Sequence, residues 1–295
     1  MTATGAQAAG RGPAGQVPIT RRLRRLRRAP LWLAVTVICV LCLFPFFWML
    51  LTSFKPDGDI FTATPKFYTT APVLSRYTQL WSTGFPRYFL NSLIVALGTT
   101  LVGTAIAAMA GYVLARFRVP ARRYLLLLVL MVQLIPQVVL VIPLFVMVRS
   151  AGLLNSYVGL ILCYLPLTIS LGIWMMRSFF VNIPPEMEEA ALVDGASRLT
   201  AFYRIVLPLA WPGLSASAIY AFITSWNELM FALTIMQNSS MQTLPVALTQ
   251  YFATYYNEWG GVMAASAVFS APVIVFFLLV QRRLVQGMVV GAIKG

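Results

Sequence analysis

Apolar runs of about 20 residues recur along this chain, and they constrain its fold more than any other feature. A helix needs about 20 mostly apolar residues to cross a hydrocarbon core about 30 Å thick. The runs predict six transmembrane helices, at Leu31–Leu51, Phe89–Leu114, Tyr124–Val148, Val158–Met176, Leu214–Met236 and Gly261–Val280. Only 10% of the 295 residues are charged, against about 25% in soluble domains. We therefore expect an all-α polytopic membrane helix bundle.

Prolines interrupt two of these runs. Pro136 and Pro143 lie in the third run and Pro166 in the fourth. A proline inside a helix removes one backbone hydrogen bond and bends the helix, which membrane bundles tolerate where neighbouring groups satisfy the freed carbonyl. We therefore expect bends at these positions.

The basic residues predict the orientation of the bundle. Arginines cluster before the first run, between the second and third, between the fourth and fifth, and after the sixth. Lys and Arg near the ends of spans are retained in the cytoplasm, so both termini are expected there, with residues 1–30 as a basic cytoplasmic tail. The N-terminal arginines could also suggest nucleic acid. Because the first span begins three residues after Arg28, we favour contact with membrane lipid headgroups and expect no nucleic-acid partner.

Several kinds of chemistry are excluded by the residues themselves. The chain has no histidine, and Cys39, Cys42 and Cys163 lie in apolar runs without the spacing of a zinc site. Neither a GxSxG nucleophile motif nor a GxxxxGK[ST] phosphate-binding loop occurs. We expect no catalytic residue, no metal site and no bound cofactor, so any energy source belongs to another protein.

The most informative segment lies between the fourth and fifth runs. Asn182 and the two prolines after Ile183 suit the start of a helix, and three glutamates follow at the positive end of its dipole. Gly195 can end that helix in a left-handed conformation, and Ser197 can cap a second one. We expect a helix–turn–helix with Met187, Ala190 and Ala191 on one face, suited to a groove on a partner protein.

A family resemblance becomes evident at this segment. Glu189-Ala190-Ala191, three residues, Gly195, nine residues, then Ile205-Val206-Leu207-Pro208 match the EAA-x3-G-x9-I-x-LP signature of permease subunits of binding-protein-dependent ABC importers. Asn91-Ser92, Trp226-Asn227-Glu228 and the C-terminal residues resemble the maltose-type carbohydrate branch, as the six-span partner of a permease pair. On this resemblance, residues 31–295 form the transmembrane domain, with a coupling loop at about 178–210.

The resemblance implies a mechanism and a set of partners. A dimer of separate ATPase subunits, which carry the ATP and Mg, receives the loop and moves it on closing. A second permease completes a heterodimeric pore, and an extracytoplasmic solute-binding protein delivers a sugar or sugar-derived solute across the bacterial inner membrane. By matching position, the ATPase-coupling residues are Glu188, Glu189, Ala190, Ala191, Asp194, Gly195, Ile205, Leu207 and Pro208.

Two further groups of residues are candidates for direct roles in transport. Glu228 is the only acidic residue in an apolar run, where a charge costs at least about 2.5–3.5 kcal/mol, so it should face the bundle interior, water or a polar partner. We weigh a translocation path through Asn227 and Glu228 against a structural role. The aromatic residues Tyr251, Tyr255 and Tyr256 are candidates for contact with the binding protein, although interfacial tyrosines are also common without such contacts.

Three questions stay open at the level of the sequence: the role of a stripe of small residues, and two other classes of protein. Gly103, Ala107 and Gly111 form a stripe of small residues that would allow close helix contact, either within the chain or between subunits. An ion-coupled secondary transporter would need an ionisable relay or broken helices near the membrane midplane, for which one glutamate is thin support. A membrane enzyme would need a set of catalytic groups, which the runs lack.

Overall fold

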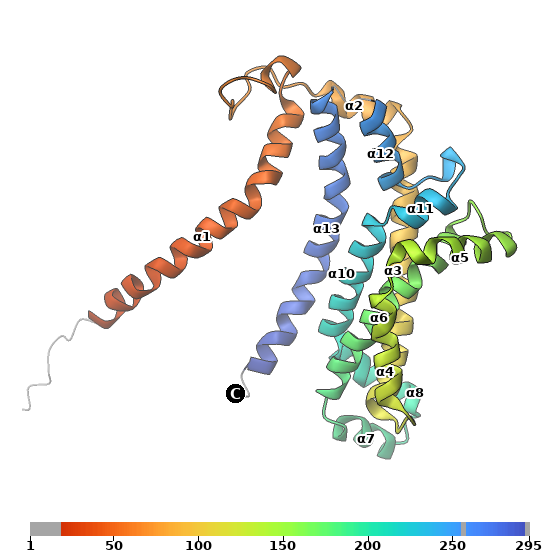
Figure 1. The fold of residues 1–295 in the computed structure, drawn as a ribbon. Helices are drawn as coiled ribbons and strands as arrows, with labels where there is room; N and C mark the ends of the chain where they lie inside the picture. Colours follow the sequence, from red (N-terminus) through yellow and green to blue (C-terminus); the bar gives the residue numbers. More distant parts are fainter. Residues whose placement is uncertain (1–18, 255–257, 293–295) are drawn as a thin grey trace, which may run out of the picture. The chain divides into compact units, whose positions relative to one another are not determined.

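The computed structural model describes residues 19–254 and 258–292, and most of these residues are helical (Figure 1). No β-strand occurs within these ranges, which confirms the all-α prediction. The α-helices up to the candidate loop are α1 (Ile19–Phe54), α2 (Ser75–Ser82), α3 (Phe85–Arg116), α4 (Arg122–Met131), α5 (Gln137–Ser150) and α6 (Tyr157–Val181). The later ones are α7 (Glu186–Val193), α8 (Arg198–Ala201), α9 (Leu207–Leu209), α10 (Trp211–Asn227), α11 (Met230–Ile235), α12 (Leu244–Thr254) and α13 (Trp259–Ala292). Short 3-10 turns are η1 (Asp57–Asp59), η2 (Val132–Leu134) and η4 (Ser239–Met241), and η3 (Phe202–Val206) is a π-helical turn.

The chain divides into two units, residues 1–48 and residues 49–295. The first unit, described from Ile19, is the N-terminal part of α1. The second unit contains the last turn of α1 and every other element. The candidate site therefore lies wholly within the second unit.

Four helices among the described residues are long and apolar enough to cross a membrane. They are Pro30–Phe54, Phe85–Arg116, Tyr157–Val181 and Trp259–Gln281. Two bent pairs qualify only when each is taken as one span: Arg122–Leu134 with Gln137–Ser150, and Arg198–Leu209 with Trp211–Asn227, bent by 97° and 77°. The number of spans is thus four, or up to six, and the predicted count of six stays a prediction.

The prolines and one glutamate explain where the helices break. The chain bends between η2 and α5, where Ile135 is extended before Pro136, as expected of a residue that precedes proline. Pro143 and Pro166 lie inside α5 and α6, which continue past them. The predicted single helix Leu214–Met236 is wrong, because α10 ends at Asn227, Glu228 is extended, and α11 begins only at Met230.

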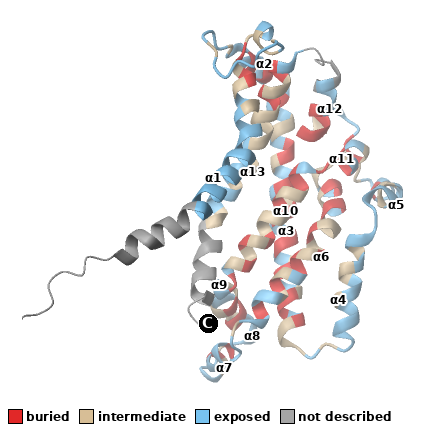
Figure 2. Cartoon of the chain, turned by 60° about the vertical axis from the view of Figure 1, so that its left-hand side comes forward, coloured by how far each residue is buried: buried red, intermediate tan, exposed pale blue. Residues whose placement is uncertain are grey.

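The core of the second unit forms where α3, α6 and α10 pack together (Figure 2). A Cβ atom at Gly103 would lie 2.9 Å from the Thr168 hydroxyl oxygen, and one at Gly111 would lie 2.8 Å from the Cβ of Met176. Gly172 of α6 faces Ala107 in the same way, with 3.0 Å between the two Cβ positions. The stripe of small residues therefore serves a contact within the chain, between α3 and α6, as small residues do in lipid.

A cluster of buried residues joins α10 to α13 and the start of α3. Trp226 is fully buried, and its indole N–H donates a 3.1 Å hydrogen bond to the carbonyl of Phe269. Phe222 stacks on Phe276 with ring centroids 4.2 Å apart. These contacts fix the C-terminal half of α10 against α13.

Polar clamps hold the loops at the end of the bundle where α2 and α12 lie (Figure 1). The Asn91 side chain donates hydrogen bonds to the carbonyls of Ser240 and Gln242, at 3.0 and 2.8 Å, and accepts one from the Tyr157 hydroxyl at 2.7 Å. The Ser92 hydroxyl accepts a 2.7 Å bond from the amide of Leu244, the first residue of α12. Buried polar groups are costly unless paired, so these bonds fix the loop before α12 onto α3.

Candidate functional site

The segment from Glu186 to Leu209 lies at the opposite end of the bundle from α12 and carries the sequence signature (Figure 1). Helix α7 ends at a left-handed Gly195, with φ of +86°. The amide of Ala196 donates to the carbonyl of Ala191 at 2.9 Å, and the amide of Gly195 donates to that of Leu192 at 3.1 Å. This pair of bonds is a Schellman motif, which satisfies carbonyls that the helix end leaves free. The predicted role of Gly195 in ending the helix is confirmed.

Only one of the two predicted N-terminal caps, that of α8, is present. The Ser197 hydroxyl accepts a 3.2 Å hydrogen bond from the amide of Thr200, which confirms Ser197 as the cap of α8. The prediction that Asn182 caps α7 is wrong. Asn182 follows the last residue of α6, and its side-chain amide donates to the carbonyl of Ser178 at 3.0 Å. Helix α7 starts at Glu186, four residues after Asn182, because the two consecutive prolines cannot extend α6 and suit the start of a new helix.

Glu188 points into the chain, whereas Glu189 points away from it. Glu188 is 6% exposed, and its carboxylate accepts hydrogen bonds from the Tyr112 hydroxyl and, at 3.2 Å, from Nε of Arg116. Arg116 also donates a 2.8 Å bond to the carbonyl of Ile183. A buried carboxylate needs a cation and further donors, and the last turns of α3 supply both. Glu188 therefore fixes α7 to α3.

Aromatic rings surround this ion pair. Tyr112 lies against Phe202 with ring centroids 4.5 Å apart and contacts Phe117 and Phe180 edge to face. The guanidinium of Arg198 lies 5.3 Å from the centre of the Phe117 ring, a cation–π contact. The rings come from α3, α6 and the segment after α8, so they join the candidate segment to the bundle core through packed apolar surface.

The outer surface of the segment exposes several large apolar side chains among charged ones. Val193 is 87% exposed, Leu199 66% and Met187 44%, and Glu189 lies exposed beside them. Ala190 and Asp194 are exposed as well, whereas Ala191 is buried. Met187, Ala190 and Ala191 are one helical turn apart in α7, as expected, but only Met187 and Ala190 are accessible to a partner, because Ala191 is buried. Exposed apolar side chains rimmed by charges are typical of a protein contact surface.

The end of the signature lies in an irregular helix. Ile205 and Leu207 are half-buried and Pro208 is exposed, on either side of the junction between the π-helical turn η3 and α9. No pattern in residues 202–206 indicates a π-helical turn. Such turns insert one extra residue into a helix and are frequent at functional sites.

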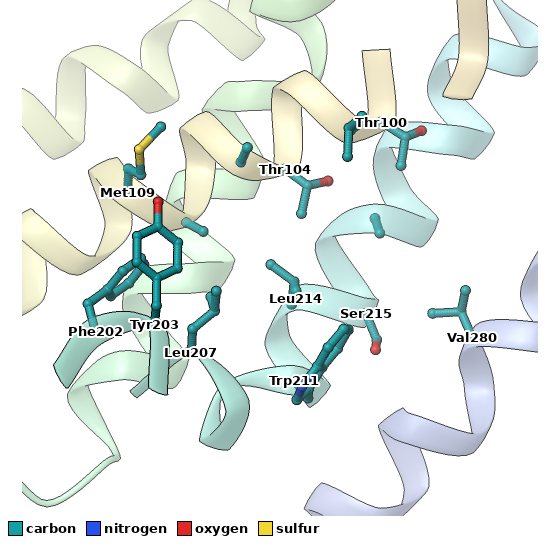
Figure 3. Close-up of a pocket in the computed structure, with 14 residues that line it drawn as sticks. Thr100, Thr104, Met109, Phe202, Tyr203, Leu207, Trp211, Leu214, Ser215 and Val280 are labelled. Carbon is teal, nitrogen blue, oxygen red and sulfur yellow. The ribbon is translucent and has the colours of Figure 1, made fainter. Parts of the chain in front are cut away.

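A cavity of about 380 Å³ lies beside this turn, between α3 and the start of α10, with Val280 of α13 at its edge (Figure 3). Its walls are apolar and include Met109, Tyr203, Leu207 and Trp211 (Figure 3). The Thr104 hydroxyl, in the same wall, is buried without a hydrogen-bond partner. The cavity is therefore bordered both by the signature segment and by the middle of α3.

The two predicted path residues behave differently. The Glu228 carboxylate is buried and accepts hydrogen bonds from the amides of Phe231 and Ala232, at 3.0 and 3.2 Å. It thus caps the N-terminus of α11, where a negative charge is favoured. Asn227 is exposed, and its side-chain amide bonds to the carbonyl of Ile223 one turn earlier. Direct contact of either residue with a solute stays a prediction.

The three tyrosines predicted to contact the binding protein lie at or beyond the end of the segment that the structure describes. Tyr251 lies in α12 and its side chain is outside the described part, while Tyr255 and Tyr256 lie outside the described residues altogether. Sequence reasoning missed Tyr112 and Arg116, which hold Glu188 from more than 70 positions away. Among the described residues, no group of three or more cysteine or acidic side chains could hold a metal ion.

The known proteins that this chain resembles are membrane components of transport systems. Residues 103–290 match the family described as binding-protein-dependent transport system inner membrane component. The chain is 37% identical over 267 residues to the diacetylchitobiose uptake system permease protein DasC of Streptomyces coelicolor, covering 90% of this chain and 97% of that protein. It is 34% identical over 274 residues to the trehalose/maltose transport system permease protein MalG of Thermococcus litoralis, covering 92% of this chain and 98% of that protein.

A solved structure shows the same fold. A chain of a bacterial ABC transporter involved in the import of the acidic polysaccharide alginate superposes with a TM-score of 0.69 at 21% identity. The match covers 91% of this chain and 99% of that chain.

Proposed function

Because the chain belongs to the family of binding-protein-dependent transport system inner membrane components, as a multi-pass permease subunit without an ATPase site of its own, we propose that it forms half of the import pore for a sugar or sugar-derived solute. Members of the family work with a second permease, an ATPase and a solute-binding protein. In the proposed assembly the second permease is a different chain, and two ATPase subunits bind the ATP and Mg. Both termini lie in the cytoplasm of a bacterial cell, and the binding protein docks on the opposite side.

One observation carries the proposed coupling. The segment Glu186–Leu209 exposes apolar side chains at its tip, and the buried Glu188–Arg116 pair anchors it to α3. A movement imposed on Val193 or Met187 by an ATPase would therefore reach the membrane helices, because Glu188 and the aromatic rings leave little freedom between them. Glu189 and Asp194, exposed beside this apolar tip, supply charges that fix the register of the contact.

The coupling is tested by crosslinking from the tip. A photo-activatable residue replaces Val193 in the full-length chain, which is then crosslinked in membranes of its native host and purified. We expect the product to contain peptides of an ATPase, identified by its GxxxxGK[ST] loop in mass spectrometry. The control position is Tyr68, 75% exposed in the loop between α1 and α2. The proposal fails if Val193 captures no ATPase, or captures it no more often than Tyr68 does.

The sugar class is supported by the relatives, which are permease proteins of uptake systems for diacetylchitobiose and for trehalose and maltose. The test is mass spectrometry of the intact complex, purified together with its binding protein from cells grown on mixed carbon sources. We expect a carbohydrate or a carbohydrate derivative as the bound small molecule. An amino acid, a peptide or a metal ion in its place would contradict the sugar class.

An ion-coupled secondary transporter receives no support. The family match and the relatives belong to ABC importers. The acidic side chain that such a mechanism would use, Glu228, already accepts two backbone hydrogen bonds at the start of α11.

A further inference from the structure

A hollow of about 310 Å³ lies between the start of α4 and the end of α6, at the same end of the bundle as α7, and the coupling mechanism does not use it. Three arginines line it: Arg122, Arg123 and Arg177. The other lining residues are Leu126, Leu127, Leu130 and Trp174, and no acidic residue takes part. The hollow thus combines a strongly basic rim with an apolar wall.

The charges of this rim are not neutralised within the described part of the chain. The ion pairs there join Lys66 to Asp59, Arg76 to Asp57, and Arg116 to Glu188, and none involves an arginine of the hollow. Nε of Arg177 is buried without a hydrogen-bond partner. An arginine without an ion-pair partner favours an anion nearby, and Arg177 is one of the residues that line the hollow. A second hollow, lined by Arg118, Arg122 and Arg123, continues the basic surface.

The apolar wall decides what kind of anion fits. Leu127 and Trp174 are each 44% exposed, and both belong to helices that qualify as membrane spans, α4 as part of a bent pair. The arginines lie at the ends of these segments, where lipid headgroups meet the hydrocarbon core. A free phosphate would leave the wall exposed to water, whereas a phospholipid places its phosphate on the arginines and an acyl chain along the leucines.

We infer that the hollow between α4 and α6 is a binding site for an anionic phospholipid of the adjacent leaflet. The guanidinium groups of Arg122, Arg123 and Arg177 hold the phosphate, and Leu126, Leu127, Leu130 and Trp174 contact the acyl chain. The bound lipid bridges α4 to α6 and supports the first half of the bent pair, whose own surface is largely exposed (Figure 2). In the orientation proposed above, the leaflet is the cytoplasmic one.

Trp174 provides a direct readout. The full-length chain is reconstituted into nanodiscs of phosphatidylcholine that contain increasing fractions of phosphatidylglycerol with brominated acyl chains, or of equally brominated phosphatidylcholine. Bromine quenches tryptophan at short range, and the Trp174 contribution is the difference between the parent chain and Trp174→Phe. We expect quenching by the anionic lipid to reach half its maximum at a fraction at least about tenfold lower than quenching by the zwitterionic lipid.

The variants separate a site from general attraction to a charged bilayer. Replacement of both exposed arginines, Arg122→Gln with Arg123→Gln, should remove the preference, whereas Arg122→Lys with Arg123→Lys should retain most of it. The control Arg87→Gln with Arg149→Gln removes the same charge from exposed arginines outside the hollow and should leave the preference unchanged. A thermal unfolding curve for each variant identifies any that fails to fold. If the glutamine variant fails to fold, the lipid preference of the lysine variant is compared with that of the parent chain.

Three results would overturn the inference. The first is equal quenching by the two brominated lipids in the parent chain. The second is an unchanged preference after Arg122→Gln with Arg123→Gln. The third is loss of the preference on addition of millimolar glycerol phosphate in solution, which would assign the arginines to a soluble phosphate without need of the apolar wall. Equal quenching together with binding of the arginines to an acidic protein surface would assign the hollow to a protein partner.

Discussion

Two adjacent glutamates in the signature have opposite environments, although their positions in the motif give no sign of it. The Glu188 carboxylate is buried against Tyr112 and Arg116, and Glu189 is exposed. The motif identified the segment and its turn at Gly195. It could not predict which glutamate points inward, because the residues that pair with Glu188 lie on α3 and their contact depends on tertiary packing.

Replacement of the inward glutamate should therefore weaken the fold, whereas replacement of its neighbour should weaken coupling. Glu188→Gln leaves Arg116, whose side chain is only 13% exposed, without its counter-charge, and loss of one partner of a buried ion pair costs about 3–5 kcal/mol. We expect a clear fall in the thermal unfolding temperature of the detergent-solubilised chain. Glu189→Gln, the matched control, should unfold like the parent yet capture less ATPase in the Val193 crosslink. Equal unfolding temperatures for the two variants would contradict this assignment.

The turn at Gly195 gives a second prediction at the scale of one residue. A Cβ atom there would meet no atom within 4 Å, so only the positive φ opposes a side chain. For a residue other than glycine or asparagine the left-handed conformation costs about 1–2 kcal/mol. We expect Gly195→Val to lower ATP-driven transport by the reconstituted complex by about tenfold and Gly195→Asn to retain most of it. Similar transport by the two variants would show that the backbone conformation of this turn does not control coupling.

Among the elements, the contact between α3 and α6 could be predicted from its small residues, whereas the division between α10 and α11 could not. Gly103 and Gly111 predict a close helix contact without specifying the partner helix. The break at Glu228 depends on a carboxylate that caps a following helix, and the continuous apolar run Leu214–Met236 hides it.

The close approach of α3 and α6 is tested at Gly111. In Gly111→Ala the new Cβ would lie 2.9 Å from the backbone nitrogen of Arg177, so one helix must shift at a cost of about 1–3 kcal/mol. We expect a lower unfolding temperature and faster inactivation in detergent. The control Gly58→Ala places its Cβ where no atom lies within 4 Å and should behave like the parent. Equal stability of both variants would mean that α3 and α6 pack less closely than described.

The clamp between α3 and the loop before α12 gives a fourth prediction. Asn91→Ala removes three hydrogen bonds and leaves the carbonyls of Ser240 and Gln242 without these donors, at about 1–3 kcal/mol for each buried group left unpaired. We expect faster backbone hydrogen exchange in residues 238–244. Asn227→Ala, which loses only a bond within α10, should leave exchange in this loop unchanged. Unaltered exchange after Asn91→Ala would contradict the clamp.

At the scale of the whole molecule, the apolar runs predicted the helical membrane fold, but the number of spans depends on the bent pairs. Tyr68 precedes α3 and Val193 follows α6, so they lie on opposite sides of the membrane only if α4 and α5 together cross it once. The length and the hydropathy of an apolar run cannot decide whether a helix pair bent by 97° crosses the membrane or returns to the side on which it began.

The side of each position is measured with a membrane-impermeant thiol reagent. Tyr68→Cys should react in right-side-out vesicles and Val193→Cys only in inverted ones. The parent chain is the control, because Cys163 is buried and Cys39 and Cys42 belong to an apolar span. Reaction of both variants from the same side would show that α4 and α5 do not form one span, and the proposed six-span topology would be wrong.

The most direct test of the central claim, that this permease is driven through α7 by an ATPase, is solute uptake by the purified complex in proteoliposomes with binding protein and a labelled sugar. We predict uptake that requires ATP on the side of Val193, persists in the presence of a proton ionophore, and falls by about tenfold or more when Gly195→Val is introduced. Uptake without ATP, or uptake abolished by the ionophore alone, would contradict the account.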